Sequence, residues 1–259
     1  MNKATSENIR AVVVNHNTSL YTELVLRSFF AMHDPDLDVS ITVMDNASRD
    51  DTTDLEVYAT GKEIPIAQSG FSVADESDTR GVHGENVHGV NSHGEVLSRF
   101  VLQNQKCKYY LFLDTDICFI EKHTIPTMVA ELEADANAFG VGARQSHGEG
   151  RLVPLPNSNP DIYESRLHPC CALIKNTPLF RHIVEEVGLS DVKFLLAGGE
   201  RIYPTCKLMT RVMKTHGLHH SISKASVIHM FAVTYNEKIR STNDEWCRNL
   251  LLPLREREE

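Results

Sequence analysis

Short apolar runs separated by amphipathic segments characterise the first half of the chain. The runs are Ala11–Val14, Ile41–Met44 and Tyr109–Leu113. Runs of this kind predict strands buried on both faces, as in the interior of a parallel sheet. Between the first two runs, apolar residues recur at helical spacing from Tyr21 to Met32, which predicts an amphipathic helix that covers the sheet.

Weaker patterns predict the elements between the second and third runs. Ser48 and Asp51 have the spacing of a capping box, which predicts a helix that begins just after Ala47. Segment 64–67 predicts a weaker strand, with Pro65 at a strand start or on an edge strand, because proline has no backbone N–H to donate to a ladder. The Gly- and His-rich segment 81–94 predicts a polar loop, and residues 96–102 predict a helix.

The second half of the chain is less regular. Its apolar patterns predict strands at 139–143, 171–174 and 225–228, and helices at 178–187 and 203–215. The prolines of segment 152–160 predict a loop, and the charged tail 255–259 predicts a solvated end.

The order of these elements indicates the fold class. Strands that alternate with helices predict an α/β fold with a mostly parallel central sheet flanked by helices, Rossmann-like in its N-terminal half. In such sheets ligands bind beyond the carboxyl ends of the strands. A length of 259 residues fits one domain, in which we expect an N-terminal half of about 8–120 and a C-terminal half of about 121–259.

Composition and charge narrow the classes of partner. A net charge of −9 argues against a nucleic-acid ligand, because duplex binding rests on clustered Lys and Arg. The polar N-terminus lacks the apolar core of a signal peptide, and no apolar run approaches the roughly 20 residues that span a bilayer. We therefore expect no transmembrane segment and a cytoplasmic location, where the six cysteines stay reduced.

Polar side chains follow three of the predicted strands at their carboxyl ends. Asn15, Asp45 and Asp114 hold these positions, so we expect them to converge on one edge of the sheet. Asp116 follows two residues after Asp114, and two such carboxylates can bind Mn²⁺ or Mg²⁺, which in turn can hold a diphosphate. Asp-x-Asp is also common as a loop start or a helix cap, and the tripeptide alone does not separate these interpretations.

Three motifs together resemble the successive motifs of family 2 glycosyltransferases of the A-type fold. In chain order they are Val12–Asn17, Val43–Ser48 and Leu111–Asp116. Asn91-x-x-Gly94 also resembles the Asn- and Gly-rich segment of that family. The resemblance extends to about residue 145. It implies a metal-dependent enzyme that moves a sugar from a nucleotide-diphospho-sugar to an acceptor hydroxyl, with inversion at the sugar carbon.

The resemblance also implies roles for individual residues in donor binding. Asp45 would bind the nucleoside, with Asn15 and Asn17 lining the pocket of the base and ribose, and Asn91 would belong to the donor site. Asp114 would face the ribose or a metal-bound water. Asp116 would ligate the Mn²⁺ or Mg²⁺ that bridges the diphosphate, next to Asp114.

Histidines raise two further questions about a metal. His229 ends a predicted strand, where it resembles the late histidine that completes the cation site in many relatives. A strand-end histidine bonded to the backbone explains the position equally well. His83, His88 and His93 recur every fifth residue, which would not place them on one helix face, so we interpret them as part of the polar loop.

Inverting transfer needs a general base that deprotonates the acceptor hydroxyl. Relatives use an acidic residue between the late strand and the following helix, and Glu200 in Gly198–Arg201 matches this best, with Asp191 as the alternative. Arg201 stands where the family often has a second acid. Glu200 could instead be a carboxylate at a helix N-terminus, complementing the helix dipole.

Three other functions compete with transfer. A phosphatase of the haloacid dehalogenase type would carry Asp-x-Asp after its first strand, whereas here it follows about the fourth. A nucleotidyltransferase would have a Gly-rich basic loop after the first strand, and segment 15–18 is not such a loop. A nucleotide-sugar-binding protein or an inactive transferase stays open, and the acceptor could be a glycan, a lipid-linked compound or a small molecule.

Overall fold

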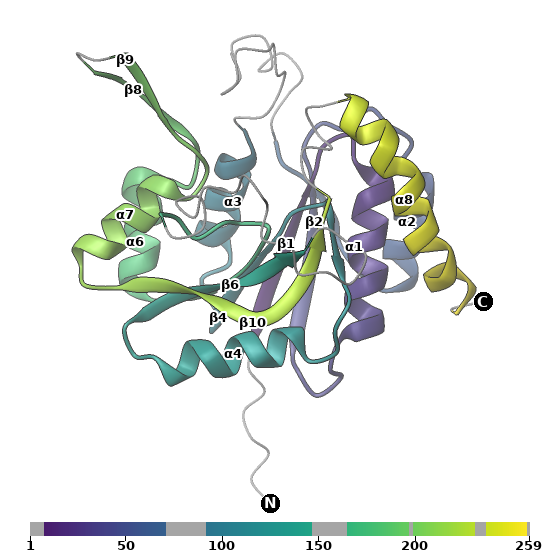
Figure 1. Ribbon diagram of the computed structural model, residues 1–259, viewed down its shortest axis with the longest axis horizontal. Helices are drawn as coiled ribbons and strands as arrows, with labels where there is room; N and C mark the ends of the chain where they lie inside the picture. Colours follow the sequence, from purple (N-terminus) through teal and green to yellow (C-terminus); the bar gives the residue numbers. More distant parts are fainter. Residues whose placement is uncertain (1–7, 71–91, 147–164, 197–198, 231–236, 258–259) are drawn as a thin grey trace, which may run out of the picture.

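The computed structural model describes residues 8–70, 92–146, 165–196, 199–230 and 237–257. Its centre is an eight-stranded sheet of order β3-β2-β1-β4-β7-β6-β10-β5 (Figure 1). The strands of this sheet are β1 Ile9–Asn15, β2 Val39–Asp45, β3 Ile66–Gln68, β4 Tyr109–Leu113, β5 Ile117–Phe119, β6 Ala138–Ser146, β7 Cys171–Lys175 and β10 His219–His229.

Helices cover both faces of the sheet, and a separate two-stranded ribbon projects beside α6 and α7 (Figure 1). The helices are α1 Ser19–Met32, α2 Thr53–Gly61, α3 Ser92–Gln103, α4 Thr124–Ala134, α6 Pro178–Val187, α7 Lys207–Thr215 and α8 Glu237–Glu256. The ribbon consists of β8 Val192–Leu196 and β9 Gly199–Tyr203. Among the described helices, none combines the length and the apolar character that crossing a membrane requires.

Two buried clusters explain why the central strands are apolar throughout. In β1, Ala11 and Val13 belong to the cluster under α1, α2 and α4, whereas Val12 and Val14 belong to the cluster under α3, α6 and α7. Strand β4 divides its side chains in the same way. The runs Ala11–Val14 and Tyr109–Leu113 are therefore apolar at every position, because neither face reaches water there. The predicted two-sided burial is confirmed.

Strand pairing agrees with the sequence in the N-terminal half and departs from it in the C-terminal half. Strands β3, β2, β1 and β4 are parallel, and β10 pairs in parallel with β6. Strand β7, however, is antiparallel to both β4 and β6, and β5 is antiparallel to β10. The sheet is therefore mostly parallel, with antiparallel strands that the apolar pattern alone did not predict.

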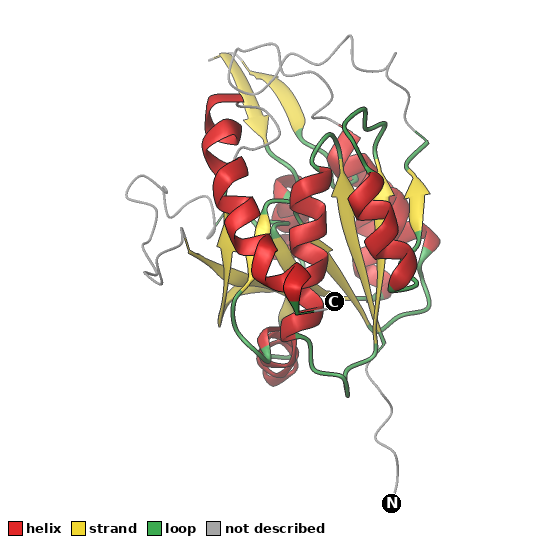
Figure 2. Ribbon diagram, turned by 90° about the vertical axis from the view of Figure 1, so that its right-hand side faces the viewer, coloured by secondary structure: helices red, strands yellow, loops and turns green. Residues whose placement is uncertain are grey.

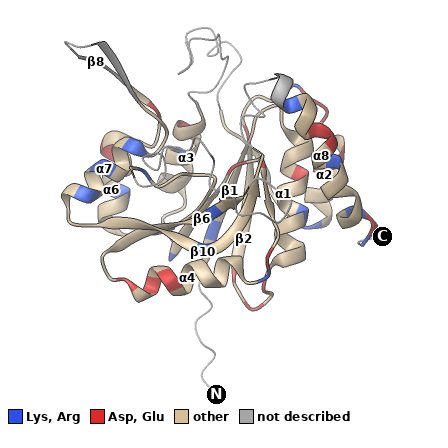
Figure 3. Cartoon of the chain, in the orientation of Figure 1, with Lys and Arg blue, Asp and Glu red and all other residues tan. Residues whose placement is uncertain are grey.

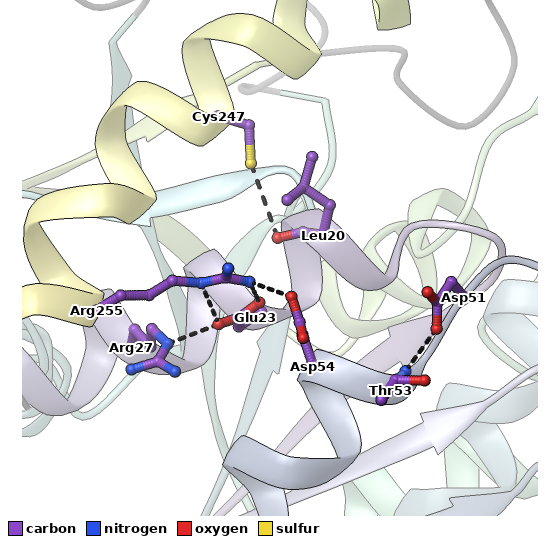
Figure 4. Close-up of polar contacts among 8 residues, drawn as sticks. All are labelled: Leu20, Glu23, Arg27, Asp51, Thr53, Asp54, Cys247 and Arg255. Carbon is purple, nitrogen blue, oxygen red and sulfur yellow. Dashed lines mark hydrogen bonds and ion pairs between the residues drawn. The ribbon is translucent and has the colours of Figure 1, made fainter. Parts of the chain in front are cut away.

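The predicted start of the second helix is wrong. Helix α2 begins at Thr53, and Asp51 accepts a hydrogen bond from its backbone N–H at 3.0 Å (Figure 4). The Ser48 hydroxyl instead accepts from the side-chain amide of Asn15 at 3.0 Å and from the backbone N–H of Asn17 at 3.1 Å. Ser48 therefore connects two strand ends rather than capping a helix.

Two other predicted boundaries shift. The helix predicted from residue 203 begins at Lys207, because Tyr203 ends β9 and Cys206 adopts a left-handed conformation with φ of 66°. Most of the predicted loop 81–94 lies outside the described residues, but its last residues open α3. Gly94 lies so close to the chain that an added Cβ would be 2.4 Å from Ser190 Cα, so only glycine fits there.

The charged tail 255–259, which was predicted to be solvated, begins inside the last helix. Arg255 belongs to α8, and its guanidinium contacts Glu23 of α1 and, at 2.7 Å, Asp54 of α2 (Figure 4). Figure 2 faces the side on which α8, α1 and α2 lie next to one another. The prediction of a solvated end is wrong for Arg255, because the carboxylates that bind it come from distant parts of the sequence, whereas Glu256 and Arg257 are exposed.

Helix α8 also reaches the carboxyl edge of the sheet. Arg240 donates to the backbone carbonyl of Asn17, and the Asn243 amide donates to the carbonyl of Met230 at 2.6 Å. The Tyr21 hydroxyl donates to Asp244 at 2.5 Å. The last helix is therefore attached to the ends of both β1 and β10.

Candidate functional site

Strands β1 and β2 end side by side in a polar junction. They are parallel and in register, so Asn15 lies opposite Asp45. The Asn15 side chain is 1% exposed, and its amide nitrogen donates to Asp45 Oδ1 at 3.2 Å. Its amide oxygen accepts from the hydroxyls of Thr18 and Thr22 at 3.1 and 2.9 Å. Asn15 therefore orients Asp45, and direct contact between Asn15 and a ligand stays a prediction.

Hydrogen bonds join the turn after β1 to the turn after β2. Asn17 has a left-handed φ of 54°, and its side-chain oxygen accepts from the backbone N–H of Arg49 at 2.7 Å. His16 Nδ1 lies 2.6 Å from the carbonyl of Asn46, so this nitrogen carries the proton. These contacts place Asn17 beside the Asp45 junction, as expected from the strand ends. Asn91 lies outside the described residues.

Asp114, Asp116 and His229 converge at the neighbouring strand ends. One ligand atom from each lies within 4.8 Å of the others, and His229 Nε2 is 3.1 Å from Asp116 Oδ1. The antiparallel pairing of β5 and β10 places His229 opposite Ile117, and the Met230 N–H donates to the carbonyl of Asp116 at 2.8 Å. The interpretation of His229 as bonded only to backbone is therefore wrong.

The electrostatics of this group favour a cation. Burial raises the pKa of Asp114, and the neighbouring Asp116 carboxylate raises it further, against the opposing charge of His93. Burial disfavours a charged His229, yet the Asp116 carboxylate raises the pKa of His229 above its ordinary value. Two carboxylates held together with little access to water repel each other, so a divalent cation between them would stabilise the ionised pair.

Gln145 is a site residue that the sequence interpretation missed. Its side-chain oxygen lies 2.8 Å from His229 Nδ1 and accepts a hydrogen bond from it. This contact directs Nε2, the other ring nitrogen, toward Asp116. The predicted strand stopped at residue 143, but β6 continues to Ser146 beside β10. The sequence signal that could have identified Gln145 is the polar stretch 144–146, which continues the predicted strand at its carboxyl end.

His93 belongs to the same site and lies in a helix rather than in the predicted polar loop. It lies in the first turn of α3, and its Nε2 is 3.6 Å from Asp114 Oδ1. Gly94 and Ser98 hold this turn against segment 188–190, where the Ser98 hydroxyl accepts from the Leu189 N–H at 2.8 Å. His83 and His88 lie outside the described residues.

Of the two candidate bases, one lies in the two-stranded ribbon and the other directly before it. Asp191 directly precedes β8, and the backbone of Glu200 lies in β9, opposite Leu195. Glu200 therefore does not begin a helix, and the alternative that it is a carboxylate at a helix N-terminus is wrong. The roles of both residues in proton transfer stay predictions.

Comparisons with known proteins identify the fold. No protein-family model matches the chain, and no curated protein sequence matches it. A mannosyltransferase from Pyrobaculum calidifontis, solved with GDP-Man and Mn²⁺, superposes with a TM-score of 0.56 at 15% identity. The match covers 88% of this chain and 58% of that enzyme, so the chain spans less than two thirds of its length.

A second solved structure supports the same fold. Glucosyl-3-phosphoglycerate synthase from Mycobacterium tuberculosis, in complex with Mn²⁺, UDP and glucosyl-3-phosphoglycerate, gives a TM-score of 0.52 at 14% identity. The match covers 97% of this chain and 81% of that enzyme. The chain has the fold of A-type glycosyltransferases, as the sequence motifs predicted.

Proposed function

We propose that this protein is a metal-dependent glycosyltransferase that moves a sugar from a nucleotide-diphospho-sugar to an acceptor hydroxyl, with inversion. The observation that carries the proposal is the grouping of Asp114, Asp116 and His229 at the end of β4, next to the Asn15–Asp45 junction at the end of β1. A nucleoside at Asp45 and a diphosphate at Asp116 would thus lie on either side of the end of β1, along the carboxyl edge of an A-type fold.

The donor atoms fit a hard divalent cation. Asp114 and Asp116 offer carboxylate oxygens and His229 an imidazole nitrogen, and Mn²⁺ or Mg²⁺ accepts such ligands. When bound, the cation would neutralise the diphosphate and polarise the leaving group. Gln145 keeps His229 Nε2 directed toward the carboxylates. The two solved relatives contain Mn²⁺ with GDP-Man and with UDP, which supports this assignment.

The transfer step follows from these parts. The acceptor oxygen forms a bond to the anomeric carbon as the bond from that carbon to the diphosphate oxygen breaks. The electron pair of the broken bond leaves with the nucleoside diphosphate, and the acceptor proton passes to a general base. Asp45, oriented by Asn15, would hold the nucleoside together with Asn17 and Asn91.

A thermal-shift experiment tests the proposal. Nucleoside diphosphates are added to the full chain with and without Mn²⁺, and the melting temperature is measured. Sugar donors that contain the stabilising nucleotide are then added, and release of the nucleoside diphosphate from them is measured. We expect stabilisation only with the cation, by about 2.7 kcal/mol at a hundredfold excess over the dissociation constant. No metal-dependent stabilisation by any nucleotide would refute the proposal. Binding without release, with or without candidate acceptors, would indicate a nucleotide-sugar-binding protein instead.

Asp45→Ala is expected to weaken nucleotide binding without unfolding the chain. The carboxylate is 8% exposed at a strand end, and its loss removes hydrogen bonds worth about 1 to 3 kcal/mol rather than an apolar contact. Calorimetric titration of the nucleoside diphosphate with Mn²⁺ measures the effect, and circular dichroism verifies the fold. Unchanged affinity in a folded variant would remove Asp45 from the donor site.

Glu200→Gln is expected to lower transfer by about a hundredfold while nucleotide and metal binding stay near wild type. Glutamine retains the shape of the side chain but cannot accept the acceptor proton. Asp191→Asn is the matched variant, measured by the same single-turnover assay. Full activity of Glu200→Gln with an inactive Asp191→Asn would assign the base to Asp191, and two active variants would exclude both residues.

A further inference from the structure

Basic and N–H-donating side chains gather on the side of Asp114 opposite the nucleoside junction. Arg166 and His168 precede β7, and Lys207 begins α7. In the sheet, β4 separates β7 from β1, and β7 is antiparallel to β4, so the start of β7 lies beside the end of β4, on the side away from Asn15 and Asp45. An anion bound there would not occupy the place proposed for the nucleoside.

Hydrogen bonds fasten the two segments that carry these residues. Arg166 Nη1 donates to the carbonyl of Thr205 at 2.7 Å, and Lys207 Nζ donates to the hydroxyl of Ser165 at 3.2 Å. The Lys207 ammonium also lies 5.7 Å from the centre of the Tyr203 ring. Arg166 thus contacts the segment before α7, and Lys207 contacts the segment before β7. Both cations therefore lie where these two segments meet.

His168 adds a neutral donor next to the proposed metal site. Its ring centre is 5.8 Å from that of His229, and its Nδ1 accepts from the backbone N–H of Cys170 at 3.2 Å. Because Nδ1 accepts this hydrogen bond, Nε2 carries the ring proton.

The charge of Arg166 acts on the metal-binding group itself. The guanidinium lies close enough to Asp114 and His229 to interact electrostatically with both. A divalent cation on Asp114 and Asp116 would repel Arg166 unless an anion lay nearby. Helix α7 adds Lys207 and Arg211 and has no acidic residue, in a chain of net charge −9 (Figure 3). The local excess of positive charge therefore favours an anionic ligand in addition to the donor diphosphate.

We propose that Arg166, His168 and Lys207 bind a phosphate or carboxylate group of the acceptor. The inference rests on the proposed transfer function and names its substrate class, a hydroxyl compound that carries an anionic group. A guanidinium can give two parallel charge-assisted hydrogen bonds to either group, and Lys207 and His168 Nε2 supply further donors. The acceptor would thus be held on the β7 side, with its hydroxyl toward the sugar.

Calorimetry on the full chain, saturated with Mn²⁺ and the nucleoside diphosphate that stabilises it, tests the inference. The nucleotide occupies the donor site, so added anions report a second site. The probes are glycerol, glycerate, glycerol phosphate and inorganic phosphate, which separate the neutral, carboxylate and phosphate cases. We expect at least one anionic probe to bind and glycerol not to bind. Arg166→Met should weaken that binding at least tenfold, while nucleotide affinity stays within about twofold.

Lys214→Met is the matched control, because it removes the same charge from an exposed position in the last turn of α7. It should leave anion affinity unchanged. Equal anion binding by wild type and Arg166→Met, equal losses in Arg166→Met and Lys214→Met, or binding of glycerol as tight as that of the anions would each overturn the inference. Lys207→Met provides the same test if Arg166→Met does not fold.

The two proposals fail in different ways. Absence of metal-dependent nucleotide binding in the wild type would refute the transfer function. In that case the anionic probes are titrated into the chain without nucleotide. Anion binding by the wild type that is weakened in Arg166→Met but not in Lys214→Met would support the anion site without the transfer function. Nucleotide binding that persists in Arg166→Met together with undiminished anion binding would refute the anion site alone.

Discussion

Asp116→Asn is expected to remove the metal-dependent part of nucleotide binding and to lower sugar transfer by about a thousandfold. Asparagine retains the shape of the side chain, which is 10% exposed, but removes the charge that faces His229 Nε2 at 3.1 Å. A thousandfold loss corresponds to about 4 kcal/mol of transition-state stabilisation, within the range expected of a metal that neutralises a leaving diphosphate.

Two measurements separate this effect from misfolding. Thermal unfolding without ligand should change little or rise, because the variant relieves repulsion between Asp116 and Asp114. The Mn²⁺-dependent shift with nucleoside diphosphate should disappear. Asp36→Asn, an exposed position far along the chain from the site, is the control for loss of one negative charge. A full metal-dependent shift in Asp116→Asn would mean that Asp116 does not hold the cation.

Arg255→Met is expected to destabilise the fold by about 3 kcal/mol, the largest effect on stability that we predict. Glu23 is 2% exposed in α1, and Arg255 donates to it through Nε at 2.9 Å and through Nη2 (Figure 4). Removing one partner leaves a carboxylate in a place with little water, which typically costs about 3 to 5 kcal/mol. Arg27 still contacts Glu23 at 2.7 Å, so we expect the lower end of that range.

Urea unfolding of three variants measures this contribution. Arg257→Met removes an exposed arginine two residues further on and should change stability by less than about 0.5 kcal/mol. Glu23→Gln combined with Arg255→Met should be less destabilised than the sum of the single changes, because the unpaired charge is gone. A loss below about 1 kcal/mol in Arg255→Met would show that solvent satisfies Glu23.

Local patterns predicted the parts of the fold and site that depend on nearby residues. The runs at β1, β2 and β4 are apolar because both faces are buried, and each is followed by its polar residue, so Asn15, Asp45 and Asp114 were placed correctly at one edge. His229 also emerged from a strand end, although its proximity to Asp116 required the antiparallel pairing of β5 with β10.

Features that depend on distant partners were not predicted. Helix α8 is polar over most of its length, and its apolar contacts with α1 become evident only when the two helices pack. Gln145 differs from an ordinary surface glutamine only through β10, which lies more than 70 residues further along the chain and places His229 beside it. The partners of Arg255 lie 232 and 201 residues away, so no local pattern distinguishes it from a solvated charge.

The attachment of α8 has a consequence for synthesis on the ribosome. The contacts from α8 to Tyr21 and Asn17 join residues 223 positions apart, and Asn243 binds the residue that follows His229. The tunnel of the ribosome still encloses this helix when the strands of the sheet have already emerged. The framework around the site is therefore completed only after α8 itself has emerged, and a premature stop codon before α8 would yield a nascent sheet without a stable site.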